Sequence, residues 1–153
     1  MAKIVGIGNA LIDIMIDLQD DALLNKFSIA KGSQEHVTKE VFDNLYNELP
    51  LSEARFISGG STANTIHALA YLGHKTAFIG VIGNDEEGKR FEEDLGKAGV
   101  YNELIRKDGD TGKVLHLKTP DGTITHVAYK GVNETISKED LTEKYLSSYS
   151  HLI

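Results

Sequence analysis

The chain has 153 residues, of which 41% are hydrophobic and 25% are charged, and its formal net charge is −7. Such a length can bury roughly 70% of the surface that the unfolded chain exposes, which is enough for one core. The acidic balance argues against an extended nucleic-acid surface, and the lack of cysteine excludes disulfides, thiolate catalysis and a Cys-ligated zinc site.

No run of the sequence approaches the ~18 apolar residues that a membrane span needs. The N-terminus also lacks the basic flank and the cleavage site of a signal peptide. We therefore expect a cytoplasmic protein with no membrane partner.

The first predicted strand covers residues 3–7 and ends at Gly8. The segment is not a dinucleotide fingerprint, because G-x-G-x-x-G requires a glycine where Leu11 stands. The helix of that motif is missing as well, since residues 12–18 alternate with a period of two and predict a second strand. A nicotinamide or flavin site is therefore not expected.

Polar side chains accompany these two strands. Asn9 follows the first strand, and Asp13 comes four residues later. In the second strand Asp13 and Asp17 share one face, and the opposite face carries Ile12, Ile14 and Ile16. We expect the isoleucine face to be buried. A solvated carboxylate is the alternative interpretation for Asp13 and the preferred one for Asp17.

The most informative segment is residues 58–66, Ser-Gly-Gly-Ser-Thr-Ala-Asn-Thr-Ile. Residues 54–57 before it read as a short buried strand. The apolar residues after it repeat at helical spacing, and Gly73 is a predicted C-cap. The segment therefore lies where a strand turns into a helix.

Two glycines stand at this junction. Gly59 and Gly60 let a ligand approach the backbone, and the N–H groups of the first helical turn point toward it. The alternative is an ordinary Gly-Gly turn, with Ser61 or Thr62 as the helix cap.

The remaining elements alternate between helix and strand. Thr38 is a predicted cap of a helix with the apolar stripe Val41, Phe42, Leu45 and Leu49. Residues 75–82 predict a buried parallel strand, and residues 86–97 predict an amphipathic helix that ends at Gly99 with Phe91 and Leu95 inward. This order is typical of a parallel sheet covered by helices.

One segment breaks the alternation. Residues 112–119 and 123–129 flank Pro120-Asp121-Gly122 and predict a β-hairpin. A hairpin beside a parallel α/β sheet commonly belongs to a separate small sheet.

Taken together, these segments resemble the ribokinase or PfkB family of carbohydrate kinases. The resemblance rests on Gly59, Gly60 and Asn64 as a Gly-Gly-x-x-x-Asn element, followed by residues 73–88 in the family's order. Residues 8–13, and residues 20–27 before 31–34, look most like the adenosine-kinase branch. The resemblance covers nearly the whole chain, from Ile4 to Ile153.

The resemblance implies an α/β fold, a Rossmann-like three-layer sandwich with a mainly parallel sheet. A small β-sheet lid would cover the substrate and exclude water from phosphoryl transfer. The lid segments would be about 14–18, 33–37 and 112–129. Residues 1–153 would form the N-terminal, substrate-binding part of such a domain.

The resemblance also assigns roles to single residues. Asp13 matches a carboxylate that accepts hydrogen bonds from two sugar hydroxyls, and its role is binding, not proton abstraction. Asn9 matches a ribose contact, Gly60 lends a backbone N–H beside Gly59, and Asn64 matches an amide that bonds another hydroxyl. Turn chemistry and capping are the alternative.

Three further residues align more loosely with the nucleoside pocket: Gln34, His36 and Asn133. The other histidines show no metal-ligand spacing, and no metal site is expected in this chain. We expect those histidines, His67, His74, His116, His126 and His151, to be solvated or half-buried.

The general-base Asp, the Gly-Ala-Gly-Asp anion hole and the ATP pocket of the family have no counterpart here, and no Walker loop replaces them. The chain stops where the family begins another strand, at residues 150–153. We therefore expect an N-terminal fragment whose C-terminal half is missing and which contains no catalytic residue.

The complete enzyme would move the γ-phosphoryl of ATP, with Mg²⁺, to the primary hydroxyl of a ribonucleoside, adenosine first. One alternative is a ribokinase- or fructokinase-like activity on a free sugar. The other is a catalytically inert binding fragment that needs a complementing C-terminal half. Self-association through the lid strands or an exposed sheet edge is expected as well.

Overall fold

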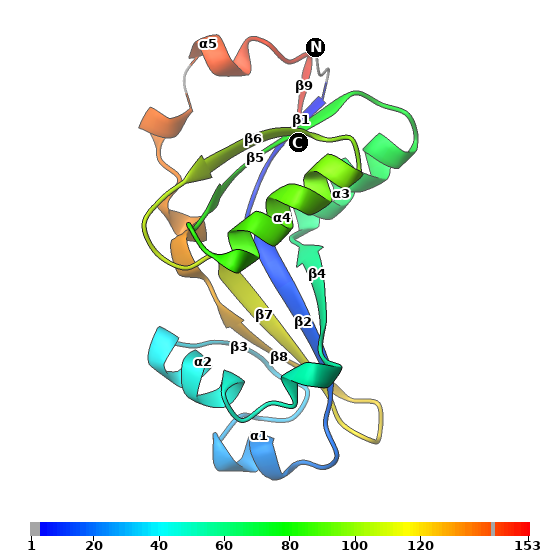
Figure 1. The fold of residues 1–153 in the computed structure, drawn as a ribbon, viewed down its shortest axis with the longest axis vertical. Coiled ribbons are helices and arrows are strands. Elements are labelled where there is room, and N and C mark those ends of the chain that lie inside the picture. The colour runs from blue at the N-terminus through cyan, green and yellow to red at the C-terminus, as the bar shows by residue number, and fades with distance from the viewer. Residues whose placement is uncertain (1–3, 142) are drawn as a thin grey trace. The chain divides into compact units, whose positions relative to one another are not determined.

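The structure, a computed structural model, describes residues 4–141 and 143–153 (Figure 1). Its chain divides into two compact units. Of the described residues, the first unit contains 4–12, 58–112 and 131–153 apart from 142. The second unit contains residues 13–57 and 113–130.

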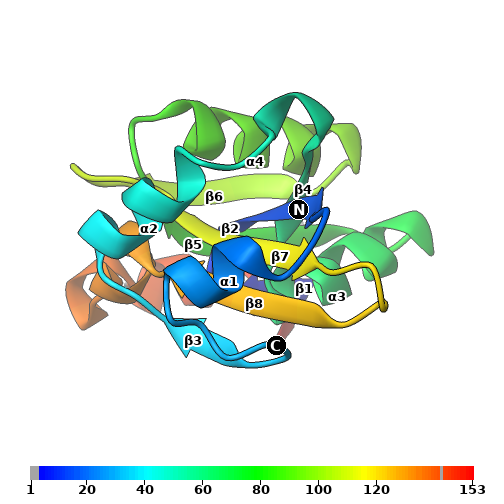
Figure 2. The ribbon, with the colours of Figure 1, turned by 90° about the horizontal axis from the view of Figure 1, so that it is seen from below.

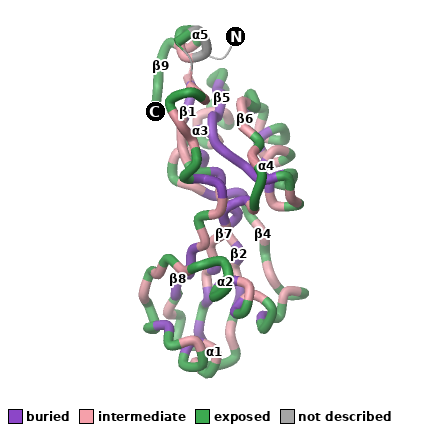
Figure 3. The backbone as a smooth tube through the Cα atoms, turned by 90° about the vertical axis from the view of Figure 1, so that its left-hand side faces the viewer, coloured by how far each residue is buried: buried purple, intermediate pink, exposed green. Residues whose placement is uncertain are grey.

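The first unit is built on a four-stranded sheet in the order β6-β5-β1-β9, in which every neighbouring pair is parallel. The strands are β1 (Ile4–Ile7), β5 (Thr76–Ile82), β6 (Tyr101–Arg106) and β9 (His151–Leu152). Every residue of β5 is buried, which Figure 3 shows as a continuous purple stretch. A central strand covered on both faces needs such an uninterrupted apolar run, so the predicted parallel sheet is confirmed.

Helices cover one face of this sheet. They are α3 (Ser61–Tyr71) and α4 (Glu86–Lys97), and both contact its strands. Phe78 of β5 lies 5.5 Å from Phe91 of α4 between ring centroids. Asp85 caps the start of α4, and Gly99, with φ of +73°, follows its end.

The opposite face is covered by the chain after residue 130. Val5, Ala77 and Ile79 form a cluster there with partly buried side chains that include Ile136 and Leu146. The elements of this segment are the 3₁₀ helices η2 (Gly131–Thr135) and η3 (Lys138–Asp140) and the helix α5 (Glu143–Leu146). The first unit is thus a three-layer α/β sandwich.

The second unit contains most of a five-stranded sheet in the order β3-β8-β7-β2-β4. Its strands are β2 (Leu11–Asp17), β3 (Gln34–His36), β4 (Arg55–Gly59), β7 (Gly112–Lys118) and β8 (Ile124–Tyr129). β7 and β8 form the predicted antiparallel hairpin, and β3 pairs with β8 in parallel. Asp121 holds the hairpin turn by accepting hydrogen bonds from Thr119 and Thr123.

One face of the five-stranded sheet is buried. Ile14 and Ile16 of β2 lie on this face, as their alternation predicted, and are at most 2% exposed. The helices of the second unit are α1 (Ala22–Lys26), α2 (Lys39–Tyr46) and the 3₁₀ helix η1 (Leu51–Glu53), and α2 contacts β8 (Figure 2). Phe42 of α2 packs on Tyr129 of β8, with ring centroids 5.8 Å apart.

Two local predictions are wrong. Val41, assigned to the apolar stripe of α2, is 37% exposed, because Phe42 and Leu45 face the sheet instead. Residues 54–57 are not a buried strand: Ile57 is 48% exposed, since β4 is the edge strand of its sheet. The alternative of Ser61 or Thr62 as the helix cap is not found either, because the N-cap of α3 is Gly60.

Candidate functional site

The start of α3 brings together several predicted residues of the first unit. Gly60 has a φ of +106°, and a Cβ on it would lie 2.3 Å from the backbone oxygen of Asn9. The loop after β1 therefore packs directly against the glycine turn, and only glycine fits there. Asn9 and Asn64 both have exposed side chains, and Gly59 at the end of β4 is buried.

The first turn of α3 is open to an acceptor. Its N-cap, Gly60, has no side chain that could cap it, and a backbone bond runs from the N–H of Asn64 to the oxygen of Gly60. The first N–H groups of a helix carry partial positive charge and bind oxygen acceptors of a ligand. The turn can therefore donate backbone N–H groups to a polar ligand.

Ser58 positions this glycine turn. Its side chain is buried and donates to Oδ2 of Asp94 at 2.7 Å, and Lys97 donates to Oδ1 of Asp94 at 2.9 Å. Burial works to raise the pKa of Asp94, but the hydrogen bonds from Ser58 and Lys97 outweigh it and hold the pKa below its usual value. The end of β4 is thus anchored to an ionised carboxylate on α4.

The second unit holds Asp13 on the less buried face of its sheet. His116 Nε2 of β7 lies 2.9 Å from Asp13 Oδ1, and the two side chains are 22% and 26% exposed. Partial burial of this kind lets a carboxylate bind hydroxyls more strongly than a fully solvated one. Asp17, on the same strand, is exposed, as predicted.

A second histidine adjoins this pair. His126 of β8 is paired with His116 across the hairpin, and their ring centroids are 4.7 Å apart in an edge-to-face arrangement. Burial lowers the pKa of His126, the charge of His116 lowers it further, and Asp13 acts in the opposite direction. Both rings are half-buried, as expected, but the sequence interpretation gave them no part in the site.

A signal for this pair was present in the sequence. A hairpin that turns at Pro120-Asp121-Gly122 places residues equally far from Asp121 opposite one another, and His116 and His126 are both five positions away. Opposed residues share a face of the sheet. What the hairpin pattern could not reveal is that β7 lies next to β2, which brings His116 to Asp13.

The three loosely aligned residues lie in different places. Gln34 and His36 are exposed on β3, and Gln34 is in register with His126. Asn133 lies in η2 of the first unit and is 3% exposed. Within the described residues, neither polar atom of its side chain has a hydrogen-bond partner. Gln34 thus lies on the face that carries Asp13, and Asn133 belongs to the interior of the first unit.

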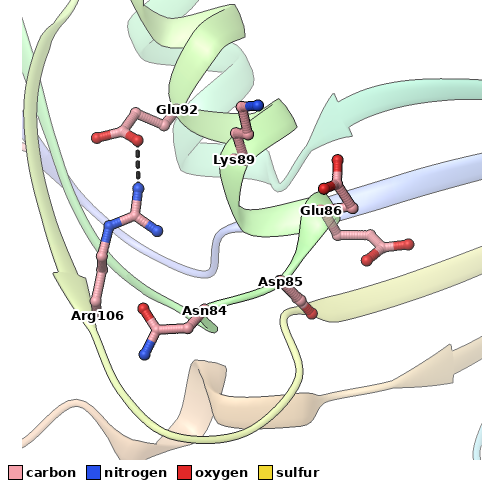
Figure 4. Close-up of a pocket in the computed structure, with 7 residues that line it drawn as sticks. Asn84, Asp85, Glu86, Lys89, Glu92 and Arg106 are labelled. Carbon is pink, nitrogen blue, oxygen red and sulfur yellow. Dashed lines mark hydrogen bonds and ion pairs between the residues drawn. The ribbon is translucent and has the colours of Figure 1, made fainter.

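Figure 4 shows a separate hollow in the first unit at the start of α4. Its lining combines the carboxylates of Asp85, Glu86, Glu87 and Glu92 with Lys89, Arg106 and Asn84. Arg106 is ion-paired with Glu92. Carboxylates repel phosphate groups, so this hollow does not fit a polyphosphate.

Within residues 4–141 and 143–153, no three His, Asp or Glu side chains are grouped as ligands of a metal ion. In the same part of the chain, every helix is too short or too polar to cross a bilayer.

Comparison with known proteins decides the family. A family model described as pfkB family carbohydrate kinase matches residues 39–153. The chain belongs to the pfkB family of carbohydrate kinases. The resemblance of the glycine turn and of residues 73–88 to this family is therefore confirmed.

Characterised relatives of this pfkB chain are kinases. An ATP-dependent ribose-1-phosphate kinase of Halopiger xanaduensis is 33% identical over 107 residues, which are 69% of this chain and 36% of that protein. An aminoimidazole riboside kinase of Salmonella typhimurium is 33% identical over 87 residues, which are 54% of this chain and 27% of that protein. The chain thus spans about a third of the relatives it matches.

Solved structures show the same fold. An adenosine kinase from Sinorhizobium meliloti superposes with a TM-score of 0.83 at 27% identity, over 99% of this chain and 46% of that one. An adenosine kinase from Anopheles gambiae, in complex with P1,P4-di(adenosine-5) tetraphosphate, gives a TM-score of 0.84 at 26% identity, over 97% and 46% of the two chains. The predicted ribokinase-like α/β fold is confirmed.

Proposed function

We propose that this chain is the substrate-binding part of a kinase that phosphorylates the primary hydroxyl of a ribonucleoside, adenosine first. The observation that carries the proposal is the half-buried carboxylate of Asp13, one oxygen of which is held by His116. The glycine turn at the start of α3 supports it, because its N–H groups are open to a ligand.

The binding chemistry follows from these groups. An ionised carboxylate accepts hydrogen bonds from two neighbouring hydroxyls and makes them stronger than a neutral acceptor would. At the glycine turn, the backbone N–H of Gly60 and the side-chain amide of Asn64 each form a hydrogen bond with a hydroxyl. Asn9 contacts the ribose. Gly59 leaves room beside the backbone. Gln34, His36 and Asn133 are proposed contacts of the nucleoside.

This chain binds and orients the substrate. Phosphoryl transfer is accelerated mainly by positioning and by stabilisation of charge, and an oriented hydroxyl supplies the first of these. ATP is the proposed donor, with Mg²⁺, in the complete kinase. The hollow at the start of α4 is not a proposed site for its phosphates, because four carboxylates line it.

A free sugar is the first alternative substrate, since the proposed contacts recognise ribose hydroxyls and both named relatives act on ribosyl compounds. The second alternative is a binding fragment that has no catalytic activity of its own and needs a complementing half. It agrees with the match to only 36% of the first relative's length.

Calorimetric titration of adenosine, ribose and fructose into the complete kinase tests the proposal. We expect adenosine to bind with the lowest Kd and ribose with a measurable one. Preference for ribose or fructose over adenosine would establish the free-sugar alternative. Absence of binding by all three would contradict both.

A further inference from the structure

Polar side chains form a row across the five-stranded sheet. Gln34 of β3 is paired with His126 of β8, and His126 is paired with His116 of β7. Paired residues point to the same face of a sheet. His116 then reaches Asp13 of β2 with Nε2 at 2.9 Å from Oδ1. The row lies opposite Tyr129, on which α2 packs, because His126 and Tyr129 are three positions apart on β8.

The two oxygens of Asp13 differ in this row. Oδ1 is bonded by His116, whereas in the described part of the chain Oδ2 has no hydrogen-bond partner. An ionised carboxylate only accepts hydrogen bonds, so His116 must carry its proton on Nε2 to bond it. The histidine therefore fixes the orientation of the carboxylate and leaves Oδ2 for another donor.

His126 holds the ring of His116 in place. The two rings meet edge to face at an interplanar angle of 86°, an arrangement that aromatic rings favour. Burial and the nearby His116 both lower the pKa of His126, so that its ring is neutral at neutral pH. A neutral neighbour does not repel His116 from Asp13.

We propose that His116 is a positioning residue for substrate binding, which orients the Asp13 carboxylate so that Oδ2 accepts the substrate's hydroxyls. The inference rests on the proposed function, because it concerns the same carboxylate. A carboxylate that is already ordered loses less conformational freedom on binding than a free one. His116 itself donates to Asp13 and not to the substrate.

Three replacements of His116 separate these roles. The amide nitrogen of Gln corresponds to Nε2 of histidine, whereas that of Asn is one bond shorter and Leu has no donor. With adenosine as the probe and the complete kinase as the protein, H116Q should bind within about 3-fold of the unmodified enzyme. H116N and H116L should bind ~10-fold or more weakly, since a hydrogen bond to a charged group is lost.

Kinetics and a matched control complete the experiment. In H116N and H116L, KM for adenosine should rise and kcat should change less, because the lost interaction acts on binding. His74 is exposed in the first unit, and H74Q should leave both constants unchanged. Nitrogen-15 NMR of the unmodified protein should find His116 protonated at Nε2, a measurement that needs neither a variant nor a ligand.

The outcomes that overturn the inference differ from those that overturn the function. Equal losses in H116Q, H116N and H116L would mean that His116 only fills space, and unchanged binding in H116L would mean that it does not act on Asp13. A neutral ring with its proton on Nδ1 alone would exclude the hydrogen bond, because Nε2 would then have no proton to donate. Unchanged binding in Asp13→Ala would instead contradict the proposed function.

Discussion

Asp13 and Asp17 lie four residues apart on one strand, and their neighbours give them different properties. Asp13 is half-buried and bonded by His116, whereas Asp17 is exposed at the end of β2. Within a single strand, the residue type therefore does not decide which carboxylate can bind a ligand. The side chains brought in by the adjacent strand decide it.

We predict that Asp13→Ala in the complete kinase reduces kcat/KM for adenosine by about 2–4 kcal/mol. Hydrogen bonds to a charged group contribute roughly 1.5–3 kcal/mol each and are not fully additive. Steady-state kinetics measure the loss, and circular dichroism should find the variant folded. Asp17→Ala is the matched control and should behave like the unmodified enzyme. Wild-type kinetics in Asp13→Ala with every nucleoside and sugar would make Asp13 a structural residue only.

A second residue-scale prediction concerns pH. Burial lowers the pKa of His67 in α3 from its ordinary 6.5, with Asp94 acting in the opposite direction, and the pKa of His126 is lowered as well. A folded-state pKa below the unfolded one means that the unfolded chain binds more protons. The stability is therefore complete above about pH 6.5 and decreases as the pH falls below it.

Urea unfolding at pH 7.5 and 5.5 measures this dependence. His67→Leu should make the loss of stability between the two pH values smaller, because one titrating group is removed. His74→Leu, at an exposed position, should leave the loss unchanged. An unaltered pH dependence in His67→Leu would show that His67 titrates alike in both states.

At the scale of elements, one carboxylate joins a helix to a loop. Asp85 caps α4 by accepting from the N–H of Gly88 at 2.9 Å, and it also accepts from the N–H and the hydroxyl of Thr111 at 2.8 and 2.6 Å. Thr111 is fully buried and accepts from the N–H of Gly83. The network fixes the loop before β7 against the start of α4.

We predict that Asp85→Ala lowers the free energy of unfolding by about 2–4 kcal/mol. The loss combines a helix cap, worth roughly 0.5–2 kcal/mol, with the buried donors of Thr111 that it leaves unpaired. Glu86→Ala, at the next and exposed position, should change the stability by no more than about 0.5 kcal/mol. Equal urea midpoints for the two variants would show that the network contributes nothing.

At the scale of the molecule, the chain spans 36% of a kinase relative and 46% of a solved adenosine kinase. Its sequence contains the glycine turn of the family but no Gly-Ala-Gly-Asp motif. The parallel sheet has β9 at one edge, where Leu152 and Ile153 are 61% and 48% exposed. The edge strand β9 is thus followed and formed by exposed apolar side chains.

We predict that the isolated 153-residue chain has no kinase activity above background. The sequence contains no Gly-Ala-Gly-Asp motif, so we expect no preorganised site for the transition state in this chain. Coupled assays with ATP and adenosine check this. Turnover that Asp13→Ala abolishes would contradict the prediction.

We also predict that the isolated chain associates with itself or with a complementing half. An unpaired strand edge is a template for another strand, and exposed apolar side chains favour its coverage. Light scattering over a concentration series should find the average mass rising with concentration. A monomer of constant mass at all concentrations would indicate a protected edge.

Part of the candidate site followed from local patterns. The glycine turn, the faces of β2 and the hairpin were predicted because each depends on residues near in sequence. β6 was not predicted, since its residues alternate poorly and it forms only by pairing with the buried β5. The exposure of Ile57 was missed for a similar reason, because a strand's position at the sheet edge is not a local property.

The sequence by itself determined the α/β fold, the family and the candidate carboxylate, because turn geometry, apolar periodicity and a spaced motif are encoded locally. Only the tertiary structure decided which side chains meet. His116 bonds Asp13 across 103 positions of sequence, and Ser58 bonds Asp94 across 36. Such contacts depend on strand order, register and side-chain rotamers together, which no local pattern specifies.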